Sequence, residues 1–126
     1  MIRRVLAGVV LATLMTVGLA ACGGGATLTY PGNGNAARGE ALILSGTAGC
    51  VGCHAVPGSS AKDKSCPDLT HIGSQLTADQ IYTQLVDPRQ RPAPYATPFR
   101  VVADMPQNLL TTQQRADITA WLSALK

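Results

Sequence analysis

Residues 46–56 read GTAGCVGCHAV, and this short stretch carries the chemically most informative pattern in the chain. Cys50 and Cys53 are separated by two residues, and His54 follows directly. Side chains of these types can bind zinc, form a redox-active disulfide or hold haem. The remainder of the sequence discriminates among these three chemistries.

Zinc binding and disulfide chemistry both lack support elsewhere in the chain. A structural zinc site needs four ligands, and the chain has no second C-x-x-C pair, only single residues such as Cys66 and His71. The adjacent side chains of Cys53 and His54 would be strained as ligands of one tetrahedral ion. A thioredoxin-like C-x-x-C lies in a βαβ unit, and no alternating strand pattern flanks Cys50 and Cys53. Both alternatives stay open but are disfavoured.

The third chemistry, covalent haem, fits the spacing. C-x-x-C-H is the attachment signature of c-type haem, in which two thiols add to the vinyl groups of the porphyrin and the histidine faces the iron. We therefore predict one covalently bound haem c, attached through Cys50 and Cys53, with His54 as an iron ligand. A large cofactor would also help to fill the core of a small domain that has few aromatic residues.

The N-terminus has the pattern of an export signal. Two arginines are followed by an uncharged apolar run and then by LAAC, residues 19–22, which is similar to a bacterial lipobox. We predict a lipoprotein signal peptide at residues 1–21 and lipidation of Cys22, which places the protein in the cell envelope, facing the periplasm or the cell exterior. A retained transmembrane anchor is the alternative, but the run is short for a span of about 20 residues.

Processing at this site would leave a nearly neutral protein. Arg3 and Arg4 would be lost without any acidic residue, so the formal net charge would fall from +3 to +1. Nucleic-acid binding needs a basic face, and we expect no nucleic-acid partner. We expect a monomeric domain that is attached to a membrane through its lipid.

The mature chain divides into a tether and one helical domain. Residues 22–35 are rich in glycine and asparagine and predict a flexible tether, followed by a domain at residues 36–126. Helices are predicted at residues 36–45, with Asn35 as the N-cap, at residues 77–86 after a capping box, and from a second capping box at Thr111 to the chain end. The last helix has apolar residues at i, i+3, i+4 and i+7, namely Ile118, Trp121, Leu122 and Leu125.

Between the last two helices lies a proline-rich segment, residues 89–106, in which neither a helix nor a central strand is expected. It contains Met105, the only methionine that remains after residues 1–21 are removed. A lone methionine often fills a core, but this one is followed by Pro106 on an irregular segment. We predict Met105 as the second axial ligand of the iron, with His71 as the alternative.

From residue 36 to the C-terminus, the chain resembles the monohaem class I cytochromes c. The resemblance rests on GCVGCH, CPDLTHIG, DMP and the ending DITAWLSALK. The stretch PDLTHIGSQLT is most similar to the cytochrome c domain of haem-copper oxidase subunit II, although no copper-binding β-domain precedes it here. The resemblance implies an all-α fold in which the N- and C-terminal helices cross and haem lies in the core.

The resemblance also implies roles for further residues. Gly39 matches a glycine that lets an aromatic residue of the last helix approach, as Trp121 would. Pro67 matches a proline whose carbonyl accepts the imidazole N–H of the iron ligand, here His54. Family members usually have glycine before this proline, and this chain has Cys66, which is interpreted as a small buried residue or as a thiol available for pairing.

The implied function is electron transfer without enzymatic activity. An iron held by both His54 and Met105 has no open position, so it would cycle between two oxidation states without binding a substrate. The expected partners are redox proteins such as an oxidase, a reductase or a dehydrogenase. Two alternatives remain: a fixed haem subunit of such a complex, and a small haem enzyme with an open site.

Overall fold

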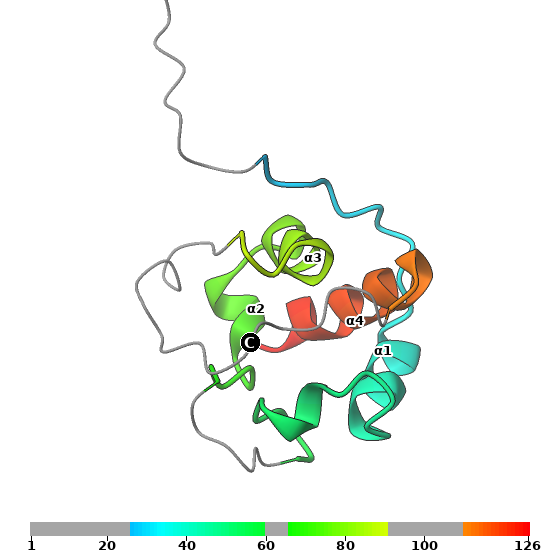
Figure 1. Ribbon diagram of the computed structural model, residues 1–126, viewed down its shortest axis with the longest axis vertical. Helices are drawn as coiled ribbons and strands as arrows, with labels where there is room; N and C mark the ends of the chain where they lie inside the picture. The colour runs from blue at the N-terminus through cyan, green and yellow to red at the C-terminus, as the bar shows by residue number, and fades with distance from the viewer. Residues whose placement is uncertain (1–25, 60–65, 91–109) are drawn as a thin grey trace, which may run out of the picture.

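The computed structural model describes residues 26–59, 66–90 and 110–126. These ranges contain a 3₁₀ turn, η1 (Cys50–Gly52), and the helices α1 (Ala36–Leu44), α2 (Ile72–Gln75), α3 (Ala78–Val86) and α4 (Thr112–Ala124) (Figure 1). No β-strand occurs in them, only an isolated bridge between Val56 and Ser59. The fold is all-α, as predicted. Within the same ranges, no helix is long and apolar enough to cross a bilayer.

The predicted helix starts are confirmed because each depends on local side-chain capping. The Asn35 side chain accepts the Arg38 N–H at the start of α1. Thr77 and Thr111 each form a reciprocal capping box with the glutamine three residues later, at the starts of α3 and α4. The ends differ slightly from the prediction, since α1 stops at Leu44 and α4 stops at Ala124.

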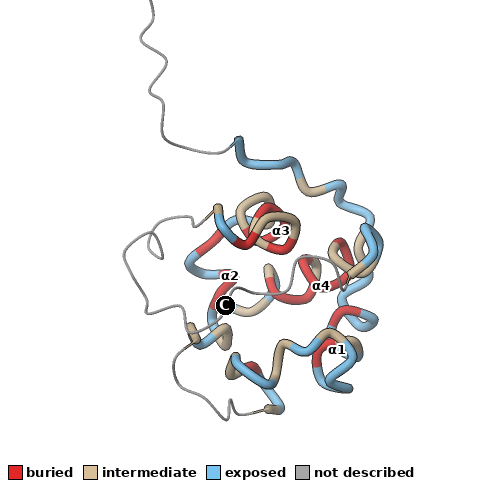
Figure 2. The backbone as a smooth tube through the Cα atoms, viewed as in Figure 1, coloured by how far each residue is buried: buried red, intermediate tan, exposed pale blue. Residues whose placement is uncertain are grey.

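The centre of the fold is the crossing of α1 and α4, and both helices carry buried residues (Figure 2). The side chains of Ile43 on α1 and Ile118 on α4 are fully buried. The two helix backbones approach each other closely at Gly39. Only glycine allows this approach, because a Cβ at this position would overlap the backbone carbonyl of Asp117. The glycine therefore accommodates the backbone of α4 itself, whereas the resemblance predicted the approach of an aromatic side chain. Trp121, which is buried, belongs to the same apolar core.

A second contact to α4 involves the short helix α2, which the sequence pattern did not predict. Gly73 of α2 lies so close to the C-terminal end of α4 that a Cβ there would overlap the carbonyl of Ser123. Ile72 of α2 is buried in the same core as α1 and α4. This packing holds the chain that precedes α3 against the last turn of α4.

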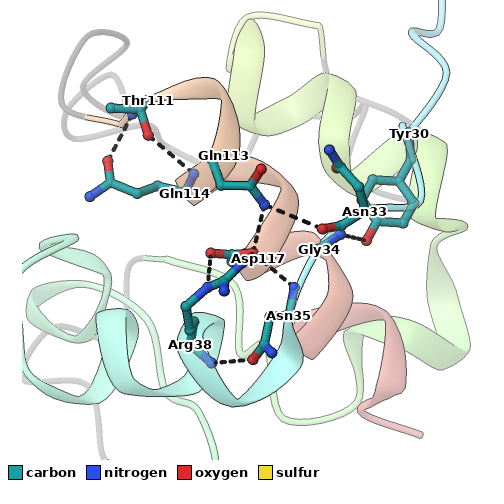
Figure 3. A network of polar contacts seen from close by, with 9 residues as sticks. All are labelled: Tyr30, Asn33, Gly34, Asn35, Arg38, Thr111, Gln113, Gln114 and Asp117. Atoms are coloured by element: carbon teal, nitrogen blue, oxygen red, sulfur yellow. Dashed lines mark hydrogen bonds and ion pairs between the residues drawn. The ribbon is translucent and has the colours of Figure 1, made fainter.

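A polar network ties the start of α1 to α4 (Figure 3). The buried carboxylate of Asp117 accepts two hydrogen bonds from the Arg38 guanidinium, at 2.9 and 3.0 Å. Its Oδ1 also accepts the Asn35 N–H at 2.8 Å and the Gln113 side-chain amide at 3.0 Å. These bonds, led by those from Arg38, hold the pKa of Asp117 well below its usual range.

The Asp117 network predicts a specific loss of stability in acid. The folded-state pKa of Asp117 is depressed. The carboxylate of Asp117 therefore contributes its full share to the free energy of unfolding above the unfolded-state pKa of about 3.9, and this contribution is lost as the pH falls below that value. We expect Asp117→Asn to lower stability at pH 7 and to weaken the pH dependence between about pH 5 and pH 2. Urea unfolding across this range measures the effect. Glu40→Gln, at an exposed position of α1, is the control and should leave the pH dependence unchanged.

The segment before α1 differs from the predicted flexible tether over the part that the structure describes. Residues 26–35, which we call the strap, pass along α3 and then reach α1 beside α4 (Figure 1). Most of its side chains are exposed, yet its backbone is bonded to both helices. The remainder of the predicted tether, residues 22–25, lies outside the described residues.

Candidate functional site

The C-x-x-C-H signature forms one tight turn at the end of the loop that follows α1. Gly49, immediately before it, has φ +70°, a left-handed conformation that favours glycine. The carbonyl of Cys50 then accepts both the Cys53 N–H, at 3.1 Å, and the His54 N–H, at 2.9 Å. Two thiols and one imidazole are thereby carried by a single turn of backbone.

The imidazole of His54 is oriented by the carbonyl of Pro67, whose oxygen lies 2.8 Å from Nδ1. A carbonyl oxygen can only accept a hydrogen bond, so Nδ1 carries the proton and donates it. The other ring nitrogen, Nε2, therefore keeps its lone pair, which is the form of imidazole that binds a metal. This contact has the geometry that the resemblance implied for Pro67.

The chain from Pro67 to Thr70, which we call the Pro67 segment, is itself held next to the C-x-x-C-H signature. The Leu69 N–H donates to the carbonyl of Ala55 at 2.9 Å, so the two chain segments are tied one residue beyond His54. Asp68 forms a local turn by accepting the N–H of Thr70 at 2.8 Å, and bonds from Thr70 lower the pKa of Asp68. The tie between Ala55 and Leu69 was not predicted, because backbone groups leave no residue-type signal.

The two thiols of the signature differ in exposure: Cys50 is half-buried and Cys53 is exposed, and they are not joined to each other. Burial raises the pKa of the Cys50 thiol and so disfavours the thiolate that a metal ion binds. A thioether carries no charge and is compatible with the half-buried position of Cys50. Within the described ranges, no group of three or more His, Cys, Asp and Glu residues could hold a metal ion.

The surroundings of this turn are apolar, as a hydrophobic cofactor requires. Cys50 and Val51 pack, partly buried, against the core that contains Ile43 and Ile118, and Leu69 of the Pro67 segment does the same. The turn, the oriented imidazole and this apolar cluster together meet the requirements for holding a haem by two thioethers and one nitrogen ligand.

Other predicted site residues lie elsewhere or outside the description. Met105 and Cys22 are both outside the described residues. His71 is exposed, and its Nδ1 lies 2.9 Å from the backbone oxygen of Lys126, at the end of the chain. Cys66 is partly buried and directly precedes Pro67. Of the predicted residues, the structure therefore brings together Cys50, Cys53, His54 and Pro67.

Comparison with known proteins supports the same assignment. The family described as Cytochrome c matches residues 36–126, more than half of the chain. The crystal structure of SoxXA from P. pantotrophus is similar, with a TM-score of 0.55 and 21% sequence identity over 74% of this chain and 82% of that chain. At this identity the likeness supports the fold alone. A search of curated proteins found no match.

The family match, the all-α fold and the C-x-x-C-H turn agree with one another. Members of this family bind haem c covalently and use it for electron transfer. The chain belongs to the cytochrome c family and is a class I monohaem protein with a covalently bound haem c.

Proposed function

We propose that the protein is a membrane-tethered carrier of single electrons in the cell envelope, with its haem iron held between His54 and Met105. The observation that carries this proposal is the bond from His54 Nδ1 to the Pro67 carbonyl, 2.8 Å long. It fixes the protonated nitrogen and leaves Nε2 as an electron-pair donor. The bound haem supplies the one-electron couple.

Met105 is proposed as the second axial ligand on the evidence of the sequence. It is the only methionine in residues 22–126, and it lies in the proline-rich segment before α4. His71, the alternative ligand, also places its Nδ1 next to a backbone oxygen, that of Lys126, so the choice of Met105 rests on its position in the sequence. A site closed by His54 and Met105 favours electron transfer over an enzyme that must bind a substrate at the iron.

The tether is proposed from the LAAC pattern at residues 19–22, with the lipid on Cys22 and the domain facing the periplasm or the cell exterior. Redox proteins such as an oxidase, a reductase or a dehydrogenase are the proposed partners. A formal charge of +1 after processing supports contact through small polar and apolar patches rather than strong electrostatic steering.

Replacing the axial methionine tests this proposal. Met105→Ala should abolish the weak absorption band at the red end of the visible spectrum of the oxidised protein, which reports sulfur bound to iron. The reduction potential should fall by on the order of 0.1 V, because thioether ligation favours reduced iron. Absorption spectroscopy and redox titration measure both effects. His71→Ala is the matched variant and should change neither; a wild type that lacks the band, together with a shifted potential in His71→Ala and not in Met105→Ala, would make His71 the ligand.

A further inference from the structure

The first half of the strap is bonded to α3 through its backbone. The Leu28 N–H donates to Thr83 Oγ1 at 2.7 Å, and the Tyr30 N–H donates to Asp79 Oδ1 at 2.8 Å. The acceptors lie 55 and 49 residues further along the chain, so these are tertiary contacts. Thr83 is buried, and its hydroxyl donates in turn to the Asp79 carbonyl at 2.7 Å. The segment is therefore placed by α3 and not by its own sequence.

Tyr30 joins the two halves of the strap. Its ring lies 6.0 Å from that of Tyr82 on α3, at an interplanar angle of 54°, a favourable tilted arrangement. Its hydroxyl accepts the Gly34 N–H at 3.1 Å (Figure 3). Gly34 lies directly on α4, because a Cβ there would overlap the carbonyl of Ala116. The strap is thus held on two helices.

The second half of the strap ends in the Asp117 network. The side-chain amide of Gln113 donates to the carbonyl of Asn33 at 3.3 Å, and Asn35 donates its N–H to Asp117 (Figure 3). The strap is therefore hydrogen-bonded to the domain at several residues between Leu28 and Asn35, and no long stretch between them lacks such a bond.

These fixed points limit how far the domain can move from an anchor at Cys22. Leu28 follows Cys22 by six residues, which span at most about 20 Å when fully extended. A linker that was free up to Ala36, the first residue of α1, would extend to about 50 Å. Docking of the strap therefore shortens the maximum reach by more than half.

The strap also determines which end of the domain is nearest to the anchor. Its first described residues lie beside α3, at the opposite end of the domain from the η1 turn (Figure 1). Cys53, which follows η1, is exposed at that far end. An anchor at Cys22 would bring the α3 end to the bilayer and leave the haem attachment turn facing away from it.

We propose that the strap is a built-in spacer: it holds the lipidated domain close to the membrane with its α3 end inward and presents the attachment turn to a redox partner. This inference rests on the lipid at Cys22 in the proposed function. The partner that fits is an extramembrane redox domain that stands on the same membrane surface, because a reach of about 20 Å excludes long excursions. The chain acts as a restrained carrier rather than as a freely swinging one.

The first test is whether the strap is docked in the full-length haem protein. Hydrogen exchange at the Leu28 and Tyr30 amides should be slow in the wild type. It should become about tenfold faster or more when Thr83→Val and Asp79→Ala remove both acceptors. Glu40→Ala, at an exposed position of α1, removes an acidic side chain elsewhere and should leave exchange at these amides unchanged. Fast exchange at both amides in the wild type would overturn the proposal.

The second test measures the reach of the lipidated protein on supported phosphatidylcholine bilayers by neutron reflectometry. The Thr83→Val, Asp79→Ala, Tyr30→Ala triple variant should thicken the protein layer by roughly 5 Å, the difference in root-mean-square span between a flexible linker of six residues up to Leu28 and one of about eleven residues up to Asn33, which stays bonded to α4. An insertion of about ten Gly and Ser residues after Gly25 should thicken it at least as much while leaving amide exchange slow, which establishes that the method resolves the change. An unchanged layer in the triple variant, with a thicker one in the insertion variant, would overturn the spacer.

The proposed function is tested separately in the same samples. Reversible oxidation and reduction should be the same in the wild type and in all strap variants, because none of the changes touches His54 or Pro67. If the triple variant shows a normal redox titration but an unchanged protein layer, the spacer role of the strap is rejected and the proposed electron-carrier function is retained. Cys22→Ser protein should leave the bilayer; if it binds as the wild type does, the lipid anchor and the spacer are both rejected.

Discussion

Replacing Cys50 and Cys53 together with alanine is expected to remove covalent haem from the protein completely. Their thiols are carried by one turn, which is closed by two hydrogen bonds to the Cys50 carbonyl, and they are the attachment points of the family signature. Wild-type protein made in a host with haem-maturation machinery should keep its haem absorbance after denaturation, and the double variant should lose it.

The double variant should also fold poorly. The domain is small, and partly buried residues of the turn, Cys50 and Val51, pack against its core. Circular dichroism should therefore report reduced helix content. Cys66→Ser is the control, because Cys66 is outside the signature and its replacement should leave covalent haem in place. Haem that acid acetone extracts from the wild type would contradict covalent attachment.

The second large effect is expected at the crossing of α1 and α4. A methyl group added at Gly39 would overlap the Asp117 carbonyl, and the backbone of Ile118 lies just behind it. Because backbone on both helices would have to move, Gly39→Ala should destabilise the protein by about 3 kcal/mol or more, at the upper end for overpacking. Denaturant unfolding of the haem protein measures this.

Glu40→Ala, at the exposed position of α1 next to Gly39, is the control for the Gly39 prediction. It adds no atom at the crossing, so it should alter stability by less than about 0.5 kcal/mol. An unchanged or raised stability of Gly39→Ala would contradict the close crossing, because helix propensity and the unfolded-state entropy both favour alanine over glycine.

The features that could be predicted from the sequence are those that depend on neighbouring residues. Asn35, Thr77 and Thr111 cap their helices through side chains that bond within three residues, so the starts of α1, α3 and α4 are visible in the sequence. The C-x-x-C-H turn is equally local, since the thiols and the imidazole are carried by consecutive backbone bonds. The bond between His54 and Pro67 spans 13 residues and was accessible only through the family resemblance.

The features that were missed depend on contacts between distant segments. Helix α2 has only four residues, and the close packing of Gly73 on α4 has no sequence pattern. The strap has the composition of a flexible linker, and it is fixed because backbone donors at Leu28 and Tyr30 find acceptors on α3. Composition reports the conformational freedom of an isolated segment and not the presence of a partner surface.

Carbon monoxide binding to the reduced wild-type protein at neutral pH tests the central claim most directly. An electron carrier with both axial positions of its iron occupied by His54 and Met105 should keep its absorption spectrum unchanged in carbon monoxide, while it still takes up and releases one electron reversibly. Rapid formation of a carbon monoxide complex by the wild type would contradict the account, because it would reveal an open iron site suited to a haem enzyme.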